Sequence, residues 1–155
     1  MHTHFNSLDA RTRDAVEADL GFAWMLYEQS VRPLMEPHLH LARKSAWDEN
    51  AEKDAFLSIW DLKKVLMITV EDNPIGWLSI DSSENTIRIE NIYLLEKFRG
   101  HGLGTTLLNW LISIHPDRPF ILSLIEGCRS ESLYNRLGFV EQKEIGFEKI
   151  FIRPN

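Results

Sequence analysis

The sequence has little of what disulfide-bonded or membrane proteins need. Its 155 residues include one cysteine, Cys128, which excludes an intrachain disulfide and argues against a metal site built from thiolates. No apolar run approaches the roughly 20 residues that span a bilayer. The start, MHTHFNSLDARTRD, lacks the apolar core of a signal peptide. We therefore expect a cytoplasmic protein that does not associate with membranes.

The sequence also lacks a basic excess. Its 17 Lys and Arg residues against 23 Asp and Glu residues give a formal net charge of −6. A nucleic-acid binder needs a stripe of positive charge, whereas the cations here are scattered. We expect no nucleic-acid partner, and the acidic balance suits a cationic acceptor. Candidate acidic residues for that acceptor are Glu28, Glu36, Asp48 and Glu49.

The remaining composition suits a globular protein. Hydrophobic residues make up 44% of the chain, and no repeat or linker interrupts it, so we expect a single domain over residues 1–155. Helical periodicity begins at Glu17, and Pro33 is expected to end that helix near Arg32. Asp48 is a plausible N-cap for a second helix. Residues 8 to 14 are too polar to predict a strand.

Alternating apolar residues then predict an antiparallel meander of three strands, Val65 to Val70, Ile75 to Ile80 and Thr86 to Leu95. Strict alternation in the third strand puts Ile87, Ile89, Asn91, Tyr93 and Leu95 on one face, and Arg88, Glu90, Ile92 and Leu94 on the other.

The second half predicts a crossover. An amphipathic helix from Leu103 to Ile114 separates the meander from a strand at Pro119 to Ile125, so these strands should be parallel. A short helix, Ser130 to Leu137, is stopped by Gly138 with Phe139 placed for a Schellman ending. Two short strands follow, Val140 to Glu144 and Phe147 to Ile152. The fold class is therefore mixed α/β, with about four helices around a mixed sheet.

A glycine-rich turn that carries cations joins the meander to the amphipathic helix. It consists of Arg99, Gly100, His101, Gly102, Leu103, Gly104 and Thr105. Glycines permit positive φ and close approach of the backbone, and a helix start leaves N–H groups unpaired at its positive end. The turn therefore predicts a cradle of backbone amides for a pyrophosphate.

Two common phosphate loops do not fit this turn. A P-loop needs a lysine directly after its last glycine, and none stands there. A dinucleotide fingerprint needs glycine or alanine where this chain has Thr105 or Leu107. The pattern that remains is [RQ]xxGx[GA], which Arg99, Gly102 and Gly104 satisfy.

This pattern resembles motif A of the GCN5-related N-acetyltransferase (GNAT) superfamily, whose loop binds the pyrophosphate of acetyl-coenzyme A. Residues 133–139, LYNRLGF, are similar to the family's LYxxLGF segment, and residues 13–20, RDAVEADL, look like its RxATxxDL opening. The resemblance extends from Arg13 to the C-terminus. It implies a GNAT-like fold with splayed central strands, and an enzyme that transfers acetyl groups from acetyl-CoA to amines without a metal.

The resemblance also implies where acetyl-CoA binds. Amides of the turn from Arg99 to Thr105 would hold the pyrophosphate, with His101 or Arg99 adding positive charge. Backbone groups of the preceding strand would pair with the pantetheine arm like an added strand; they map to Ile92, Tyr93 and Leu94. The Leu94 N–H would also polarise the thioester carbonyl.

The same resemblance implies a general acid at Tyr134, which would protonate the leaving thiolate and contact the cofactor. The family usually has proline where this chain has Glu96, and often asparagine where it has Gly127. These departures leave open a second function, a catalytically inactive acyl-CoA-binding module that regulates a partner.

An amine acceptor must lose a proton before it attacks. For a lysine-like amine with a pKa of about 10.4 this costs roughly 4 kcal/mol at neutral pH, so a base is useful. Glu90 projects from the strand that leads to the cradle and is the preferred candidate, with Glu126 or a water chain as alternatives; an ion pair is the competing role for Glu90. The acceptor is expected to be a small molecule or peptide, bound over the first two helices and the late strand pair by a monomer or homodimer.

Two other features of the sequence bear on metal binding and on nucleophilic catalysis. His38 and His40 have metal-like spacing but no visible third ligand, so no metal site is predicted. Cys128 lacks a clear histidine and asparagine pairing, so it is interpreted as a loop residue rather than an acyl-accepting nucleophile.

Overall fold

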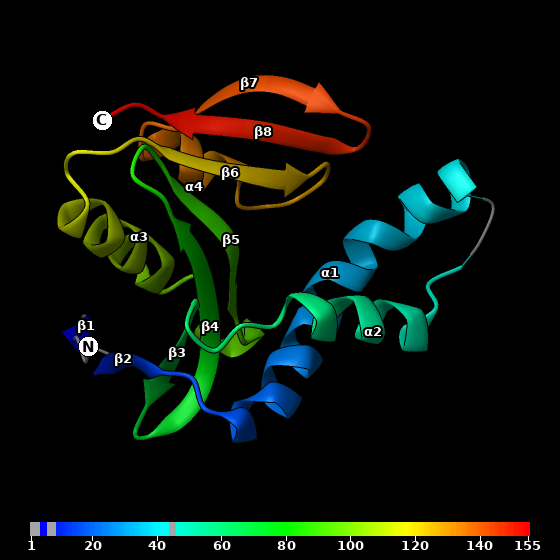
Figure 1. The fold of residues 1–155 in the computed structure, drawn as a ribbon, viewed down its shortest axis with the longest axis horizontal. Helices are drawn as coiled ribbons and strands as arrows, with labels where there is room; N and C mark the ends of the chain where they lie inside the picture. Colours follow the sequence, from blue (N-terminus) through cyan, green and yellow to red (C-terminus); the bar gives the residue numbers. More distant parts are fainter. Residues whose placement is uncertain (1–3, 6–8, 44–45) are drawn as a thin grey trace.

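The protein folds around one mixed sheet (Figure 1). The structure, a computed structural model, describes residues 4–5, 9–43 and 46–155. Within these residues the strand order is β1-β2-β3-β4-β5-β6-β8-β7. The strands are β1 His4–Phe5, β2 Ala10–Asp14, β3 Val65–Val70, β4 Asn73–Ser82, β5 Ile87–Leu94, β6 Phe120–Ile125, β7 Val140–Ile145 and β8 Glu148–Arg153. The helices are α1 Leu20–Arg43, α2 Glu49–Ile59, α3 Leu103–Ile114 and α4 Glu131–Arg136.

Helices cover both faces of the sheet (Figure 1). One apolar cluster joins α3, through buried residues such as Leu107 and Leu111, to Phe120 and other sheet residues. The second cluster joins α1 and α2 to the opposite face around the rings of Trp24 and Trp77. Burying a large apolar side chain contributes about 1.5–3 kcal/mol, so these two clusters hold the helices on the sheet. None of the described helices is long and apolar enough to cross a membrane.

The first helix is longer than the sequence predicts. Pro33 was expected to end it, but α1 continues through Pro33 and Pro37 to Arg43. Each proline removes one backbone hydrogen bond from the helix. Packing offsets this loss, since Val31 and Leu39 on either side of Pro33 are 5% and 2% exposed. The predicted end of the helix near Arg32 is therefore wrong, and His38 lies in the helix.

The prediction that residues 8 to 14 do not form a strand is also wrong. Strand β2 pairs antiparallel with β3, and Ala10 and Thr12 are fully buried. Arg11, which lies between them, is exposed, so period-two alternation is present although the mean polarity is high. At the end of β2, Arg13 donates two hydrogen bonds of 2.8 Å to Asp19. This ion pair fixes the entry to α1.

The meander, the crossover and the late strand pair are confirmed. β3, β4 and β5 pair antiparallel, and β5 pairs parallel with β6 after the α3 crossover. One feature of β5 was not predicted. Ser79 pairs with Asn91 whereas the next residue, Ile80, pairs with Ile89, so Glu90 is the extra residue of a β-bulge.

The bulge reverses the faces predicted for the second half of β5. Ile92 and Leu94 pack in the same cluster as Ile87 and Ile89, on the α3 side. Tyr93 packs instead in the α1 and α2 cluster. An inserted residue shifts the period-two alternation by one, so every side chain after Glu90 changes face.

The same position is where the parallel strands separate. Pairing between β5 and β6 runs from Ile87 and Phe120 to Ile89 and Leu122 and ends there. Beyond Glu90, β6 keeps its pairing with β8 on its other side. The two central strands therefore form a V that opens toward their carboxyl ends, as the resemblance implies.

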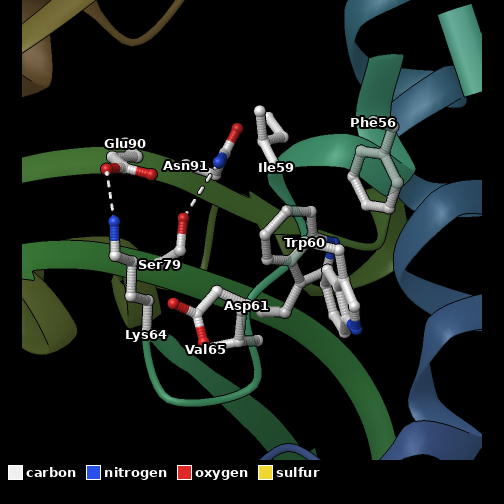
Figure 2. A pocket seen from close by; sticks show the side chains of 10 residues that line it. Phe56, Ile59, Trp60, Asp61, Lys64, Val65, Ser79, Glu90 and Asn91 are labelled. Atoms are coloured by element: carbon white, nitrogen blue, oxygen red, sulfur yellow. Dashed lines mark hydrogen bonds and ion pairs between the residues drawn. The ribbon is translucent and has the colours of Figure 1, made fainter. Parts of the chain in front are cut away.

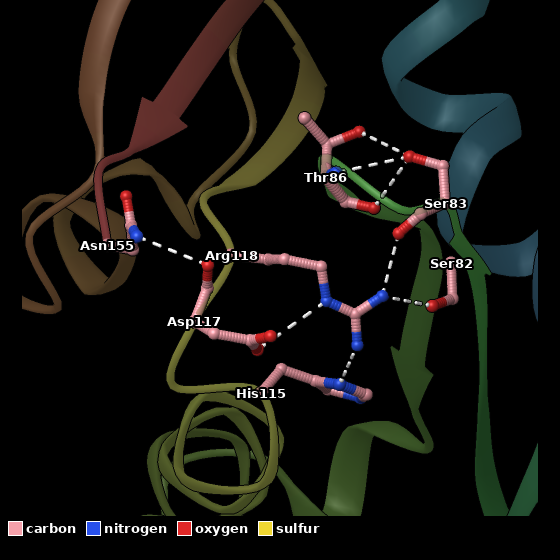
Figure 3. A network of polar contacts seen from close by, with 7 residues as sticks. All are labelled: Ser82, Ser83, Thr86, His115, Asp117, Arg118 and Asn155. Carbon is pink, nitrogen blue, oxygen red and sulfur yellow. Dashed lines mark hydrogen bonds and ion pairs between the residues drawn. The ribbon is translucent and has the colours of Figure 1, made fainter.

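A polar network ties the closed end of this V (Figure 3). Arg118 precedes β6, and its Nη1 donates to Ser82 Oγ at 2.8 Å and to the Ser83 carbonyl at 2.7 Å. Its Nη2 contacts Nδ1 of His115 at 2.8 Å, so the imidazole accepts this hydrogen bond when it is neutral. The Arg118 side chain thereby joins the β4–β5 turn to the loop after α3.

Candidate functional site

The glycine-rich turn presents backbone amides that have no backbone partner among the residues the structure describes. Gly100 and Gly102 both have φ of +77°, a conformation that favours glycine. The first hydrogen bond of α3 runs from the Thr106 amide to the Gly102 carbonyl at 3.0 Å. The three amides that precede it, those of Leu103, Gly104 and Thr105, therefore have no carbonyl one turn earlier in the helix. These amides lie at the N-terminal end of α3, where the helix dipole is positive.

Not every residue of the turn contributes in the same way. The Arg99 amide is used by the protein, since it donates to the Glu96 carbonyl at 3.1 Å. Gly104 has an ordinary helical conformation, and an added Cβ would meet Leu133 at an unstrained 3.6 Å. The side chain of His101 is exposed. The amides available to a ligand thus begin at Gly100.

The Arg99 side chain holds the turn against its surroundings. Its Nε donates to the Leu94 carbonyl at 2.9 Å, and its Nη2 donates to Ser30 Oγ of α1 at 3.4 Å. These contacts link the cradle to the end of β5 and to the middle of α1. The guanidinium therefore places positive charge between the turn and the opening of the V.

The splayed strands enclose a cavity of about 100 Å³. Its walls are formed by α1, β5, β6 and the segment from Cys128 to Tyr134. The Leu95 amide donates to the Ile75 carbonyl of β4 at 2.8 Å. Because antiparallel ladders alternate, Tyr93 also directs its peptide groups to β4, whereas those of Ile92 and Leu94 face the opening. The strand thus offers the peptide groups of Ile92 and the N–H of Leu94 to the opening, while the Leu94 carbonyl already accepts from Arg99 Nε.

Tyr134 lies in the wall of this cavity and is only 3% exposed. No hydrogen-bond partner from the described residues reaches its hydroxyl. Burial raises the pKa of Tyr134 well above its usual value, so the hydroxyl keeps its proton. The cavity therefore contains a proton donor without a protein acceptor.

The end of α4 fixes the position of this tyrosine. The Phe139 amide donates to the Tyr134 carbonyl at 3.0 Å, and the Gly138 amide donates to the Asn135 carbonyl at 3.1 Å. With Gly138 at φ of +93°, these bonds form the predicted Schellman motif. The rings of Tyr134 and Phe139 meet edge to face with centroids 5.5 Å apart.

Glu90 lies at the bulge, where the V begins. Its Oε1 is 3.7 Å from Nζ of Lys64, which directly precedes β3, so Glu90 forms an ion pair (Figure 2). Its side chain is 27% exposed, and it lines both the cavity and a hollow of about 10 Å³ beside Trp60. The alternative base, Glu126, is exposed and does not line the cavity.

A hydrogen-bonded chain that the sequence did not predict crosses β5 and β4. The Tyr93 hydroxyl donates to Oδ1 of Asn91 at 3.0 Å, and Nδ2 of Asn91 donates to Ser79 Oγ at 2.9 Å. Figure 2 shows the second of these bonds beside the Glu90 pair. Burial raises the pKa of Tyr93 well above its usual value. Strict alternation did not predict this chain, because the bulge moves the side chains of Asn91 and Tyr93 to the face that packs on α1 and α2.

Several acidic residues considered for an acceptor have structural partners. Glu28 and Glu36 lie on either side of Arg32, at 3.8 Å and 3.1 Å from its guanidinium. Asp48 caps α2 by accepting from the Ala51 amide at 3.1 Å. These contacts occupy three of the four carboxylates named from the sequence.

The described residues contain no cluster of three or more histidine, cysteine, aspartate or glutamate residues suited to a metal ion. His38 stacks on Phe147 with ring centroids 4.8 Å apart. The side chain of His40, its predicted companion, lies outside what the structure describes.

Comparison with known proteins identifies the family of this chain and structures that share its fold. The sequence profile of the acetyltransferase (GNAT) family matches residues 24–139. No curated protein sequence matches the chain.

Solved structures share its fold at low identity. The PaiA N-acetyltransferase from Thermoplasma acidophilum, in complex with coenzyme A, is 15% identical, with a TM-score of 0.70 over 94% of this chain and 99% of that chain. PH1933 from Pyrococcus horikoshii OT3 is 15% identical, with a TM-score of 0.69 over 94% and 98%. The ribosomal-protein-S18-alanine N-acetyltransferase from Escherichia coli is 20% identical, with a TM-score of 0.63 over 94% and 93%.

Proposed function

This chain belongs to the acetyltransferase (GNAT) family, and on that premise we propose that it is a single-domain enzyme that moves an acetyl group from acetyl-CoA to a primary amine. The observation that carries the proposal is the continuity of three features. Unpartnered amides from Gly100 to Thr105 lead to the free edge of β5, and that edge borders the cavity that contains Tyr134.

The residues present fit acetyl-CoA as the donor. The amides from Gly100 to Thr105 would hold its pyrophosphate at the positive end of α3. The peptide groups of Ile92 would pair with the pantetheine arm, and the N–H of Leu94, whose carbonyl accepts from Arg99, would orient the thioester carbonyl. Acetyl-CoA supplies the activated acetyl group. The structural neighbour from Thermoplasma acidophilum, which was solved in complex with coenzyme A, supports this assignment.

Arg99 and His101 play supporting parts in this proposal. Arg99 adds positive charge and fixes the turn through the Leu94 carbonyl. His101, exposed at the edge of the turn, can add charge when protonated. Tyr93 would contribute through its ring and its bond to Asn91, since its peptide groups face β4.

Tyr134 would donate the proton that the leaving thiolate requires. Its burial keeps the hydroxyl protonated, and the cavity gives it an open hydrogen-bonding position. Donation by a positioned side chain typically contributes about 100-fold or more to a rate. We therefore assign the general acid to Tyr134.

Glu90 would accept the proton of the incoming amine, directly or through water. It lies at the point of the V, on both the cavity and the hollow beside Trp60. Its Oε1 lies 3.7 Å from the Lys64 ammonium, a cation of the kind that an amine acceptor would present. An amine would compete with Lys64 for this carboxylate.

The acceptor would approach from the face that carries α1 and α2. The rim of the hollow there combines Asp61 and Glu90 with the side chain of Ile59, which is 63% exposed. This combination suits a cationic amine with an adjacent apolar group. A small molecule or a peptide N-terminus meets this description, and the Escherichia coli neighbour is named for an alanine acceptor.

A thiol-release assay with acetyl-CoA tests the proposal. The panel comprises polyamines, aminoglycosides, amino acids and peptides with free N-termini. We expect thiol release with at least one amine and tight binding of CoA by calorimetry. Binding of CoA without turnover on the whole panel would favour a regulatory acyl-CoA-binding module, and absence of CoA binding would overturn the proposal.

A further inference from the structure

Cys128, the only cysteine of the chain, stands in the wall of the cavity. It follows β6 in a tight turn, in which Gly127 has φ of +94° and the Cys128 amide donates to the Ile125 carbonyl at 3.0 Å. The thiol is partly exposed and forms no disulfide. The fold thus directs a single free thiol to the space between the splayed strands.

A second observation shows that this space is built for a ligand. Tyr134 is only 3% exposed and lines the same cavity. Its hydroxyl has no hydrogen-bond partner among the described residues. The hydroxyl oxygen is nevertheless not one of the buried polar atoms left without a partner in that part of the chain, so it faces the open space of the cavity, where a ligand or water can satisfy it. The same hydroxyl is the group that would lie beside the donor sulfur. Cys128 therefore shares the cavity with the expected position of that sulfur.

We propose that Cys128 is a modification site that forms a mixed disulfide with the thiol end of coenzyme A. The inference rests on the proposed function, because the cradle must bind the diphosphate for the arm to reach this cavity. The co-reactant is a disulfide of coenzyme A.

The step is a thiol–disulfide exchange. The Cys128 thiolate attacks one sulfur of the coenzyme A disulfide, a new S–S bond forms, and the original S–S bond breaks. The departing coenzyme A thiolate takes up a proton, so one thiol is consumed and one is released. Cys128 is oxidised and the departing half is reduced.

The cradle makes this exchange selective. Amides from Gly100 to Thr105 that hold a diphosphate raise the local concentration of the attached disulfide at Cys128. Pantethine, the disulfide of the same arm without the diphosphate, lacks this anchor. Once formed, the adduct fills the donor site, so acetyl transfer stops until a reductant removes it.

Intact-mass measurement of the folded protein tests the proposal. The protein is incubated with coenzyme A disulfide, pantethine or oxidised glutathione at equal concentrations. We expect a single adduct of one coenzyme A, formed about tenfold or more faster than either other adduct. Reduced coenzyme A should slow it by competition, and dithiothreitol should reverse it. Because the chain has one cysteine, any disulfide adduct reports on Cys128.

Two comparisons separate this inference from the proposed function. In denaturant the three disulfides should react at similar rates, since the cradle is lost. In a Cys128→Ala variant, treatment with coenzyme A disulfide followed by removal of the reagent should leave turnover at that variant's own untreated level. Equal rates for all three disulfides with folded protein that binds CoA would overturn the inference alone. Failure to bind CoA would overturn the proposed function.

Discussion

Tyr134 and Phe139 are joined both through the backbone and through their rings. The Phe139 amide donates to the Tyr134 carbonyl at 3.0 Å, and the two rings meet edge to face with centroids 5.5 Å apart. The turn that allows both contacts depends on Gly138 at φ of +93°. The hydroxyl of Tyr134 is thereby held at the cavity by the end of its own helix.

The first prediction concerns the hydroxyl itself. Tyr134→Phe should lower kcat about 100-fold and leave the Kd for CoA unchanged, because it removes a proton donor but keeps the ring. Turnover and calorimetry measure the two effects. Tyr27→Phe makes the same chemical change at a ring that packs on Phe56, outside the cavity lining, and should keep turnover. Unchanged kcat in Tyr134→Phe would contradict the role of general acid.

The second prediction concerns Gly138. Gly138→Ala should lower the free energy of unfolding by about 1–2 kcal/mol, since an L side chain is strained at this positive φ. The added Cβ itself meets Arg153 at an ordinary 3.5 Å. Denaturant unfolding measures the loss. Gly21→Ala, in α1 with open space around it, is the control and should be neutral or stabilising.

The third prediction separates strain from ligand contact in the cradle. Gly102→Ala and Gly146→Ala both place a methyl group at positive φ, +77° and +60°, in open space. Both should lose about 1–2 kcal/mol of stability. The affinity for CoA should fall about tenfold only in Gly102→Ala, because Gly146 lies in the β7–β8 turn. Equal CoA affinities in the two variants would argue that the pyrophosphate binds elsewhere.

The fourth prediction concerns the ion pair at the entry to α1. Hydrogen bonds from Arg13 hold the pKa of Asp19 below its usual value of 3.8. The ionised carboxylate therefore contributes stability above that pH, and the contribution is lost as the pH falls through the lower folded pKa. Asp19→Asn should lose about 1–3 kcal/mol at neutral pH and show a weaker dependence of stability on acid pH.

Asp14→Asn is the matched control for that pair, since Asp14 is exposed at the end of the same strand. Denaturant midpoints at neutral and acid pH measure both variants. The pair would have no stabilising role if Asp19→Asn and Asp14→Asn unfolded at the same midpoints.

The fifth prediction concerns pH and the closed end of the V. Burial and the charge of Arg118 lower the pKa of His115 below its usual value of 6.5. The unfolded state therefore takes up a proton first, and the stability that neutral His115 provides is lost as the pH falls below that value. His115→Asn keeps an acceptor for Arg118 but does not titrate. Its unfolding free energy should fall less than that of the unchanged protein between about pH 7.5 and about pH 5.5.

Much of this fold follows from local patterns in the sequence. The bounds of β3 were predicted to the residue, because a nearly continuous apolar run, VLMITV, lies there between the charged residues Lys64 and Glu71. The Schellman ending was predicted because Gly138 and Phe139 occupy the two positions that define it. The glycine-rich turn was predicted because few other structures require glycines so close to a helix start.

What the sequence could not predict depended on tertiary contacts. Pro33 is unfavourable in a helix, and the burial of α1 residues such as Val31 and Leu39 against the sheet offsets its cost. Strict alternation also misses the bulge at Glu90, which decides which face Tyr93 occupies, although the adjacent polar residues Glu90 and Asn91 mark the shift in the apolar pattern. The use of the Arg99 amide by Glu96 is likewise a property of the folded turn.

The position of bound coenzyme A tests the central claim most directly. A crystal structure of the protein with CoA should show the pyrophosphate oxygens within hydrogen-bond distance of the amides from Gly100 to Thr105, and the sulfur beside the Tyr134 hydroxyl. A complex in which the pyrophosphate lies away from these amides, or the arm outside the V between β5 and β6, would contradict the account.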